Sequence, residues 1–452
     1  MKKTICLLAA TMLFFGCNDD KKEPEFTILK GTINNMTTDS ISVSRGEFVE
    51  KIALNKDGSF SDTLDLPIAG YYTLRVDREI TRMYLVPETR VSISLNTKQF
   101  DESIRYTGDN SAENNYLVKK FLLSEKIDIS PKEIMQNEIG LDSLAMIVDK
   151  NEQKYLDLLH TNKLDSSFVA MEEKAIHYKK ALALERQAFI YQRMGKDSLT
   201  KGFVGPEINL DNAEDFENFD AYQQLVMIDF SKATSVQTDT SASYSDKAFA
   251  YLDRLESENI KTTGLQRISY RIRPGNEDNK EIYDNIMQRS SDTKFKEELT
   301  VRFKKIQQLK KGNPSPTFTY ENYKGGETSL GDLRGKHVYI DVWATWCGPC
   351  LAQIPALQKI EKNYHGKNIH FVSISIDTEN AYEKWKKMVT EKELGGIQLI
   401  ADNAWDSEFV QNYAINGIPR FILVDPQGNI VSANAPRPSD PELINLFEEV
   451  GI

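Results

Sequence analysis

The chain has few cysteines and few histidines for its length. Its 452 residues include four cysteines and five histidines. A zinc site needs about four ligands, but the sequence holds only one close cysteine pair, Cys347 and Cys350, and no histidine stands at a matching spacing from it. His160 and His177 also lack the spacing of a helical metal site. The sequence therefore predicts no metal centre.

Positive charge is also in deficit. Lys and Arg number 56 against 67 Asp and Glu, which gives a formal net charge of −11. A nucleic-acid binder needs a basic face for the phosphates, so this balance argues against nucleic acid as a partner. It also argues against attachment to anionic lipid through surface charge.

The apolar run at the N-terminus is too short to span a bilayer. It covers residues 4–15 and follows the positive segment Met1-Lys2-Lys3, a pattern that predicts a signal peptide, residues 1–16. Gly16 directly before Cys17 looks like a bacterial lipobox, which predicts lipidation of Cys17 and a polar tether at residues 17–25. The alternative is an ordinary signal peptide followed by a chance cysteine.

These assignments leave one thiol pair in the mature protein. Cys6 would leave with the signal peptide, and Cys17 would carry acyl chains. Cys347 and Cys350 would then have no other cysteine of the same chain as a disulfide partner, even in an oxidising compartment.

The remaining chain predicts a multidomain protein with three regions. Residues 26–108 contain short segments of alternating apolar and polar residues separated by turn signals, which predict an all-β domain, a small antiparallel sandwich or barrel. Residues 109–311 carry apolar stripes at helical spacing and predict a helical region. Two prolines and a glycine near residue 312 cannot continue a helix, so a boundary is expected there. Residues 312–452 alternate strand and helix patterns and predict an α/β domain.

The most informative stretch lies in this last region. Tyr339-Ile340-Asp341-Val342-Trp343 predicts a buried strand, which ends in a turn that carries Cys347-Gly348-Pro349-Cys350, and helical spacing follows. A thiol at a helix N-terminus has a stabilised thiolate. The thiolate is the nucleophile in disulfide exchange, and the second thiol is near enough to resolve the mixed disulfide.

Trp346-Cys347-Gly348-Pro349-Cys350 after a strand resembles the thioredoxin superfamily, and its context resembles the TlpA/ResA-like, AhpC/TSA-related branch of membrane-anchored thiol–disulfide oxidoreductases. The resemblance covers about residues 313–452 and implies a thioredoxin-like fold. A β-rich domain ahead of it resembles lipoproteins of the same order, in which the β-rich domain would be a spacer or docking module.

The resemblance also implies roles for individual residues. Asp341 would take the proton of the second thiol, with a pKa raised by burial. Gly417-Ile418-Pro419 matches a cis-proline loop, in which the Ile418 backbone would bind an extended substrate segment. Substrate contacts are expected at Trp346, Gly348, Pro349, Ile418 and Pro419. For Arg420 two readings stay open, an acidic partner or exposure to solvent.

Three further interpretations compete with disulfide exchange. A zinc site lacks ligands, because one cysteine pair supplies only two of the four that it needs. A thiol peroxidase would carry Pro and Thr or Ser where this chain has Ile340 and Ala344. A surface-anchored adaptor would use the thioredoxin fold as a scaffold and bind partners through its other two regions.

The favoured hypothesis is an enzyme that reduces or isomerises disulfides of exported proteins, without a cofactor. The Gly-Pro dipeptide between the thiols resembles that of thioredoxin, a reductant, rather than that of the oxidant DsbA; the two differ by about 150 mV, or roughly 7 kcal/mol. The expected location is the cell envelope, with a lipid anchor in a membrane facing the periplasm or on the outer surface. The expected partners are disulfide-containing exported proteins and a membrane electron donor.

Overall fold

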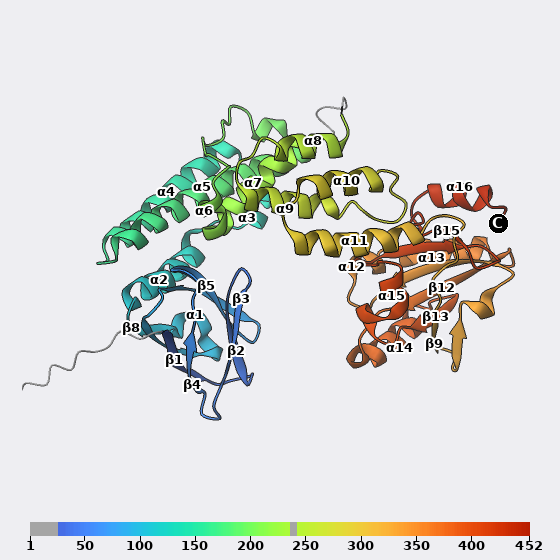
Figure 1. Cartoon of the computed structure of the whole chain (residues 1–452), viewed down its shortest axis with the longest axis horizontal. Helices are drawn as coiled ribbons and strands as arrows, with labels where there is room; N and C mark the ends of the chain where they lie inside the picture. The colour runs from blue at the N-terminus through green and yellow to red at the C-terminus, as the bar shows by residue number, and fades with distance from the viewer. Residues whose placement is uncertain (1–25, 236–241) are drawn as a thin grey trace, which may run out of the picture. The chain divides into compact units, whose positions relative to one another are not determined.

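The computed structural model describes residues 26–235 and 242–452 (Figure 1). The predicted signal peptide 1–16, the lipidation site Cys17 and the tether 17–25 lie outside the described residues. The chain divides into two compact units between Lys232 and Ala233, so the predicted helical region is shared between them. Among the described residues, no helix has the length and apolar character that crossing a bilayer requires.

The N-terminal β domain consists of two four-stranded sheets with the orders β4-β1-β7-β8 and β3-β2-β5-β6. Both sheets contribute to one apolar core, with Leu29 and Ile93 from the first and Val43 and Leu74 from the second. The expected sandwich is therefore present. The strands are β1 (Thr27–Asn34), β2 (Ser40–Arg45), β3 (Phe48–Ala53), β4 (Ser59–Leu64), β5 (Gly70–Val76), β6 (Glu79–Leu85), β7 (Arg90–Asn96) and β8 (Arg105–Gly108).

The expectation of a purely antiparallel sandwich is wrong in one place. Strands β1 and β7 pair in parallel, with Leu29 opposite Val91. Parallel neighbours need a long crossover connection, and here the crossover includes the whole second sheet. An alternating pattern identifies a strand but does not identify its partner, so the sequence could not show this pairing.

Helices complete the first unit. The long pair α4 and α5 packs around Leu144, Ala188 and Tyr191, and Asp165 begins α5 by accepting hydrogen bonds from the N–H groups of Ser167 and Phe168. The helices, including the short 3-10 turns η1 and η2, are η1 (Thr97–Gln99), α1 (Phe100–Ser103), α2 (Ser111–Ile127), α3 (Pro131–Gln136), α4 (Leu141–His160), α5 (Ser166–Arg193), η2 (Asp197–Leu199), α6 (Ala213–Asn218) and α7 (Asp220–Ala233).

The second unit begins with four helices, α8 (Tyr244–Leu252), α9 (Glu258–Ser269), α10 (Asn279–Arg289) and α11 (Thr293–Gln308). Leu309, directly after α11, is buried in the core of the following α/β domain. The segment after it pairs with strand β15 (Ile430–Ser432) and its preceding turn: Gly312 N–H donates to Ile430 C=O at 2.8 Å, and Ser315 N–H donates to Gly428 C=O at 2.9 Å. The predicted boundary is therefore a hydrogen-bonded extension of the sheet.

The C-terminal domain is a seven-stranded mixed sheet with the order β10-β9-β13-β12-β11-β14-β15. Strands β11, β12 and β13 are parallel, and β14 runs antiparallel to β11. All seven residues of β11 are buried, as expected for a strand covered on both faces. The other strands are β9 (Thr319–Asn322), β10 (Glu327–Ser329), β11 (His337–Trp343), β12 (Ile369–Ser375), β13 (Ile397–Ile400) and β14 (Arg420–Val424).

Helices cover both faces of this sheet. Tyr339 and Phe371 share an apolar cluster with Leu357 of α13 and Phe447 of α16; on the other face, Ile340 shares a cluster with residues of α14 and α15. The fold class predicted for residues 312–452, a thioredoxin-like α/β domain, is present. The helical segments are η3 (Gly331–Leu333), α12 (Gly348–Leu351), α13 (Ile354–Asn363), η4 (Glu379–Ala381), α14 (Tyr382–Glu391), η5 (Ala404–Asp406), α15 (Glu408–Asn412) and α16 (Glu442–Glu449).

The helix expected after the thiols is broken. A four-residue helix, α12, ends at Leu351, and α13 begins at Ile354 with Pro355 in its first turn. Proline has no N–H to donate and its ring clashes with the preceding turn, so it is accepted at a helix start but not in the interior. The proline was visible in the sequence and marks the break.

Candidate functional site

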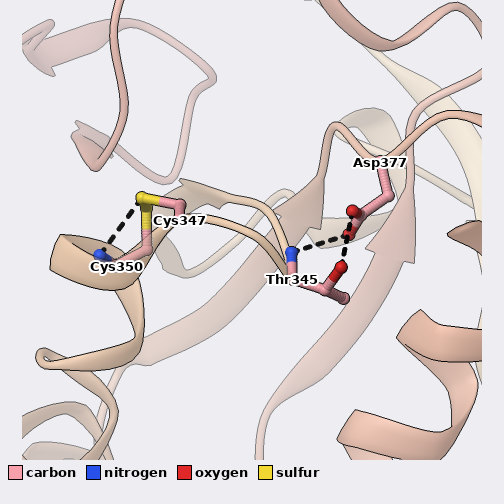
Figure 2. Close-up of a disulfide and its surroundings, with 4 residues drawn as sticks. All are labelled: Thr345, Cys347, Cys350 and Asp377. Carbon is pink, nitrogen blue, oxygen red and sulfur yellow. Dashed lines mark hydrogen bonds between the residues drawn. A yellow bond between two sulfur atoms is a disulfide. The ribbon is translucent and has the colours of Figure 1, made fainter. Parts of the chain in front are cut away.

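The two thiols lie where central strand β11 gives way to α12. Cys347 and Cys350 are joined by a disulfide, with 2.01 Å between the sulfur atoms and 5.3 Å between the Cα atoms (Figure 2). Cys347 is the cap residue of α12, and the Cys350 N–H donates to Cys347 Sγ at 3.2 Å. In the reduced protein, an N–H directed at this sulfur would favour the thiolate of Cys347.

The surface around the disulfide is formed by the residues expected to contact substrate. Both cysteines are buried, at 5% and 4% exposure, whereas Trp346, Gly348 and Pro349 are exposed. Trp346 is 55% exposed, and its ring lies 6.4 Å from the ring of Trp405, centroid to centroid. Exposed apolar atoms next to a shielded disulfide suit contact with another polypeptide.

The turn before Cys347 is held by a buried carboxylate (Figure 2). Asp377 accepts a hydrogen bond from the Thr345 N–H at 2.9 Å and one from Thr345 Oγ1 at 2.8 Å. Ser375 Oγ donates to the same carboxylate at 2.7 Å. Asp377 is only 2% exposed, so these donors supply the compensation that a buried carboxylate needs. Asp377 thereby fixes the backbone two residues before the first thiol.

Asp341 lies near the end of β11, on the sheet face that α13 covers. It is 9% exposed, and its Oδ1 atom has no hydrogen-bond partner among the described residues. Burial, and secondarily the nearby Glu361 carboxylate, raise the pKa of Asp341 to about 8. Burial also raises the pKa of Glu361, on α13, to about 7. The expected rise in the pKa of Asp341 through burial is therefore confirmed, and its role as a proton acceptor stays a prediction.

The peptide bond between Ile418 and Pro419 is cis, as the loop pattern predicts. Pro419 directly precedes β14, which is hydrogen-bonded to β11. Ile418 packs against the apolar cluster that contains both cysteines. The fold thus brings the cysteine pair and the cis-proline loop, about 70 positions apart in the sequence, to one site.

The structure gathers the predicted residues Asp341, Trp346, Cys347, Gly348, Pro349, Cys350, Ile418 and Pro419 around the end of one strand pair, β11 and β14. Sequence reasoning missed Asp377 and Glu361. Asp377 carried a signal, because a lone acidic residue ended an apolar strand at the same sheet edge as the thiols. Glu361 carried a weaker signal, because it stands four residues after Leu357 and three before Tyr364, on the apolar face of α13. Within the described part of the chain, no cluster of three or more His, Cys, Asp or Glu side chains could hold a metal ion.

Comparison with known proteins gives consistent matches in this region. The Redoxin family model matches residues 310–446. Thiol-disulfide oxidoreductase ResA of Bacillus subtilis is 24% identical over 124 residues, which is 27% of this chain and 66% of ResA. The chain therefore spans just under two thirds of that relative. ResA of Bacillus cereus is 25% identical over 130 residues, 28% of this chain and 72% of that relative.

Solved structures match the same third of the chain. The thioredoxin domain of a thiol-disulfide oxidoreductase from Bacteroides vulgatus is 31% identical, with a TM-score of 0.29; the match covers 31% of this chain and 98% of that domain. A solution structure from the same organism is 51% identical, with a TM-score of 0.28 and coverages of 32% and 93%. Residues 310–446 thus match the Redoxin family model, and the C-terminal domain is similar to thiol–disulfide oxidoreductases of the ResA type.

Proposed function

We propose that this protein is exported, is anchored to a membrane through a lipid on Cys17, and reduces or isomerises disulfides of exported proteins. The observation that carries the proposal is the single thiol pair, Cys347 and Cys350, at the end of the central strand beside the cis-Pro419 loop. The other two cysteines, Cys6 and Cys17, lie in the predicted signal peptide and at its cleavage site.

The reaction begins with the reduced protein. The Cys347 thiolate attacks one sulfur of a client disulfide, forms a mixed disulfide and expels the other client sulfur as a thiolate. The Cys350 thiolate then attacks Cys347 Sγ, which releases the second client thiolate and leaves the Cys347–Cys350 disulfide. Two electrons pass to the client, and the two protons lost by the dithiol balance the two thiols formed.

Asp341 supports the second step. Its pKa of about 8 lies near the usual thiol value of about 8.5, so a proton passes from the Cys350 thiol to the carboxylate with little free-energy change. A base with a pKa near the working pH is the most effective general base. No group in the described part of the chain hydrogen-bonds to Oδ1, which leaves that atom able to accept the proton.

The cis-proline loop supports client binding. Ile418 and Pro419 border β14, and an extended client segment could hydrogen-bond to the Ile418 backbone in the manner of strand addition. Exposed Trp346, Gly348 and Pro349 would contact the client on the other side of its disulfide.

Trapping tests the exchange reaction. Cys350→Ser leaves Cys347 able to attack but removes the resolving thiol, so mixed disulfides with client proteins should accumulate in the native cell. They should appear on a non-reducing gel and disappear with reductant. Cys347→Ser is the matched control and should trap none. If neither variant traps a protein, the adaptor interpretation is favoured.

The direction and the location need separate measurements. Equilibration with glutathione should give a potential nearer to thioredoxin's about −270 mV than to DsbA's about −120 mV; a value near the latter would make the protein an oxidant.

Lipidation predicts palmitate labelling and membrane fractionation that Cys17→Ala abolishes. A membrane electron donor would keep the dithiol reduced, and its loss should leave the protein in the disulfide form in cells.

A further inference from the structure

Arg420 directly follows the cis-proline, at the first position of β14. It is opposite Val342 of β11, and its side chain is half-buried. The guanidinium Nη1 donates a hydrogen bond to the Asn434 side-chain oxygen at 3.1 Å. A guanidinium is therefore fixed within two residues of Ile418, where the client backbone is proposed to bind.

A second arginine, Arg273, lies near enough for its charge to act on Arg420, and it comes from a connection between helices of the same unit. Arg273 is exposed and lies in the connection between α9 and α10, followed by Pro274 and Gly275. A Cβ atom added to Gly275 would lie 3.8 Å from the Cβ of Asn434. The connection thus contacts the residue that binds Arg420. Burial lowers the pKa of Arg420, and the charge of Arg273 lowers that pKa further.

Neither guanidinium is paired with a carboxylate within residues 26–235 and 242–452. Arg289 of the same unit shows the contrast, because its Nε and Nη2 atoms donate to the two oxygens of Asp253 at 2.8 and 2.9 Å. Two neighbouring positive charges without a counter-ion repel each other, and partial burial of Arg420 strengthens that repulsion. A carboxylate placed between them would relieve it, and guanidinium forks bind carboxylates well.

We propose that Arg273 and Arg420 form a binding site for a carboxylate of the client, on an Asp or Glu close to the client cysteine that Cys347 attacks. This inference rests on the proposed function and adds a substrate preference to it. It also resolves the two readings of Arg420 in favour of an acidic partner.

The preference acts on encounter and positioning, while the exchange chemistry is unchanged. The acidic group of the client binds the two guanidiniums, and the adjacent client sulfur then lies near Cys347. Bond formation, bond cleavage and the transfer of two electrons follow the steps given above. Charges at the edge of an interface mainly change the association rate and its salt dependence.

The experiment uses the full chain, reduced with dithiothreitol and freed of it. Two synthetic peptide disulfides of equal length are compared, one with Glu and one with Gln on each side of its cysteines, and the second-order rate of thiol release is measured. At low salt we expect the Glu peptide to react about tenfold faster, with the ratio falling toward one as salt screens the charges. Arg273→Gln and Arg420→Gln should each reduce the ratio several-fold.

Arg271→Gln is the matched control, since it removes a guanidinium from the same connection. Arg271 lies over the Tyr244 ring, with 4.3 Å from its guanidinium carbon to the ring centroid. The Arg271→Gln variant should therefore leave the rate ratio of the two peptides unchanged. Because Arg273 is exposed, its variant keeps the test valid even if Arg420→Gln fails to fold.

The outcomes separate the two proposals. Equal rates for both peptides in the wild type would overturn the carboxylate site and leave disulfide reduction intact. An equal loss of preference in the Arg271 and Arg273 variants would also overturn it, because overall charge would then explain the effect. A wild-type protein that reduces neither peptide overturns both.

Discussion

Two buried carboxylates, one in each compact unit, have opposite surroundings. Glu172 of α5 is 1% exposed and is paired with Lys120, whose Nζ lies 2.5 Å from Oε2, while the Tyr71 hydroxyl donates to Oε1. Asp341 of β11 is 9% exposed, has one oxygen without a hydrogen-bond partner in residues 26–235 and 242–452, and lies near another acid, Glu361. The first arrangement stabilises a charge, whereas the second favours a proton that can be given up near neutral pH. Burial alone therefore does not identify a functional acid, but burial without a partner points toward one.

The largest expected effect concerns Cys347, the thiol proposed to attack the client disulfide, which lies in the second unit with Asp341. Cys347→Ser should lower the rate of disulfide reduction by at least about 10³-fold, because the hydroxyl is not a nucleophile toward disulfides at neutral pH. Reduction of a peptide disulfide by the full chain measures it. Substantial residual activity would mean that the first unit carries chemistry that its paired side chains do not suggest.

Asp341→Asn comes next and tests the unpaired acid directly. Loss of the general base should slow resolution of the mixed disulfide by on the order of 10²-fold, and the pH dependence of that step near pH 8 should disappear. Rapid-quench measurement of the mixed disulfide gives the rate. Glu383→Gln, at an exposed acid of α14, serves as a control and should leave the rate unchanged.

The same variant should change stability in a pH-dependent way. The pKa of Asp341 is about 8 in the folded protein and about 3.9 when unfolded, so the folded state binds more protons between those values. The free energy of unfolding of the wild type should therefore fall as pH rises from about 4 to about 8. Asn at position 341 has no carboxyl group to ionise, so at pH 8 the variant should avoid up to about 5 kcal/mol of that loss. Urea unfolding at pH 5 and pH 8 measures the difference; equal effects at the two pH values would contradict the assignment.

Lys120→Met tests the paired acid. It leaves Glu172 buried without its cation, which should destabilise the first unit by about 3 kcal/mol. The double variant with Glu172→Gln should recover part of that loss. Denaturant unfolding of the full chain gives both values, and disulfide reduction should stay within about twofold of the wild type. A large loss of activity would show that the Lys120–Glu172 pair affects disulfide reduction as well as stability, which the comparison does not predict.

The smallest expected effect concerns Asp377, a buried acid that is fully partnered within the second unit. Asp377→Asn should lower stability by about 2 kcal/mol, since it disturbs the bonds from Thr345 and Ser375. Thr345→Val removes only the hydroxyl bond and should cost about half as much. The redox potential of the dithiol should shift in the same graded order, because both changes loosen the turn before Cys347. Equal potentials in all three proteins would limit Asp377 to a structural role.

Local signals made part of this site predictable. The apolar strand, the Cys-Gly-Pro-Cys turn, Asp341 six residues earlier and the cis bond before Pro419 each follow from a few neighbouring residues. The parallel pairing of β1 with β7 and the contact of Gly275 with Asn434, which binds Arg420, depend on segments about 60 and about 160 positions apart. No periodicity or turn preference encodes such distances, so these features required the structure.

The hydrogen-bonded segment at residues 312–315 bears on how the C-terminal domain can be isolated. A fragment that starts at Phe318 would expose the edge of β15 and leave an empty space where Leu309 packs. Fragments that retain α11 keep that space filled, and fragments that start before α9 also keep Arg273. Shorter pieces should therefore be less soluble and less selective than longer ones, even though every cysteine of the exchange reaction is present in both.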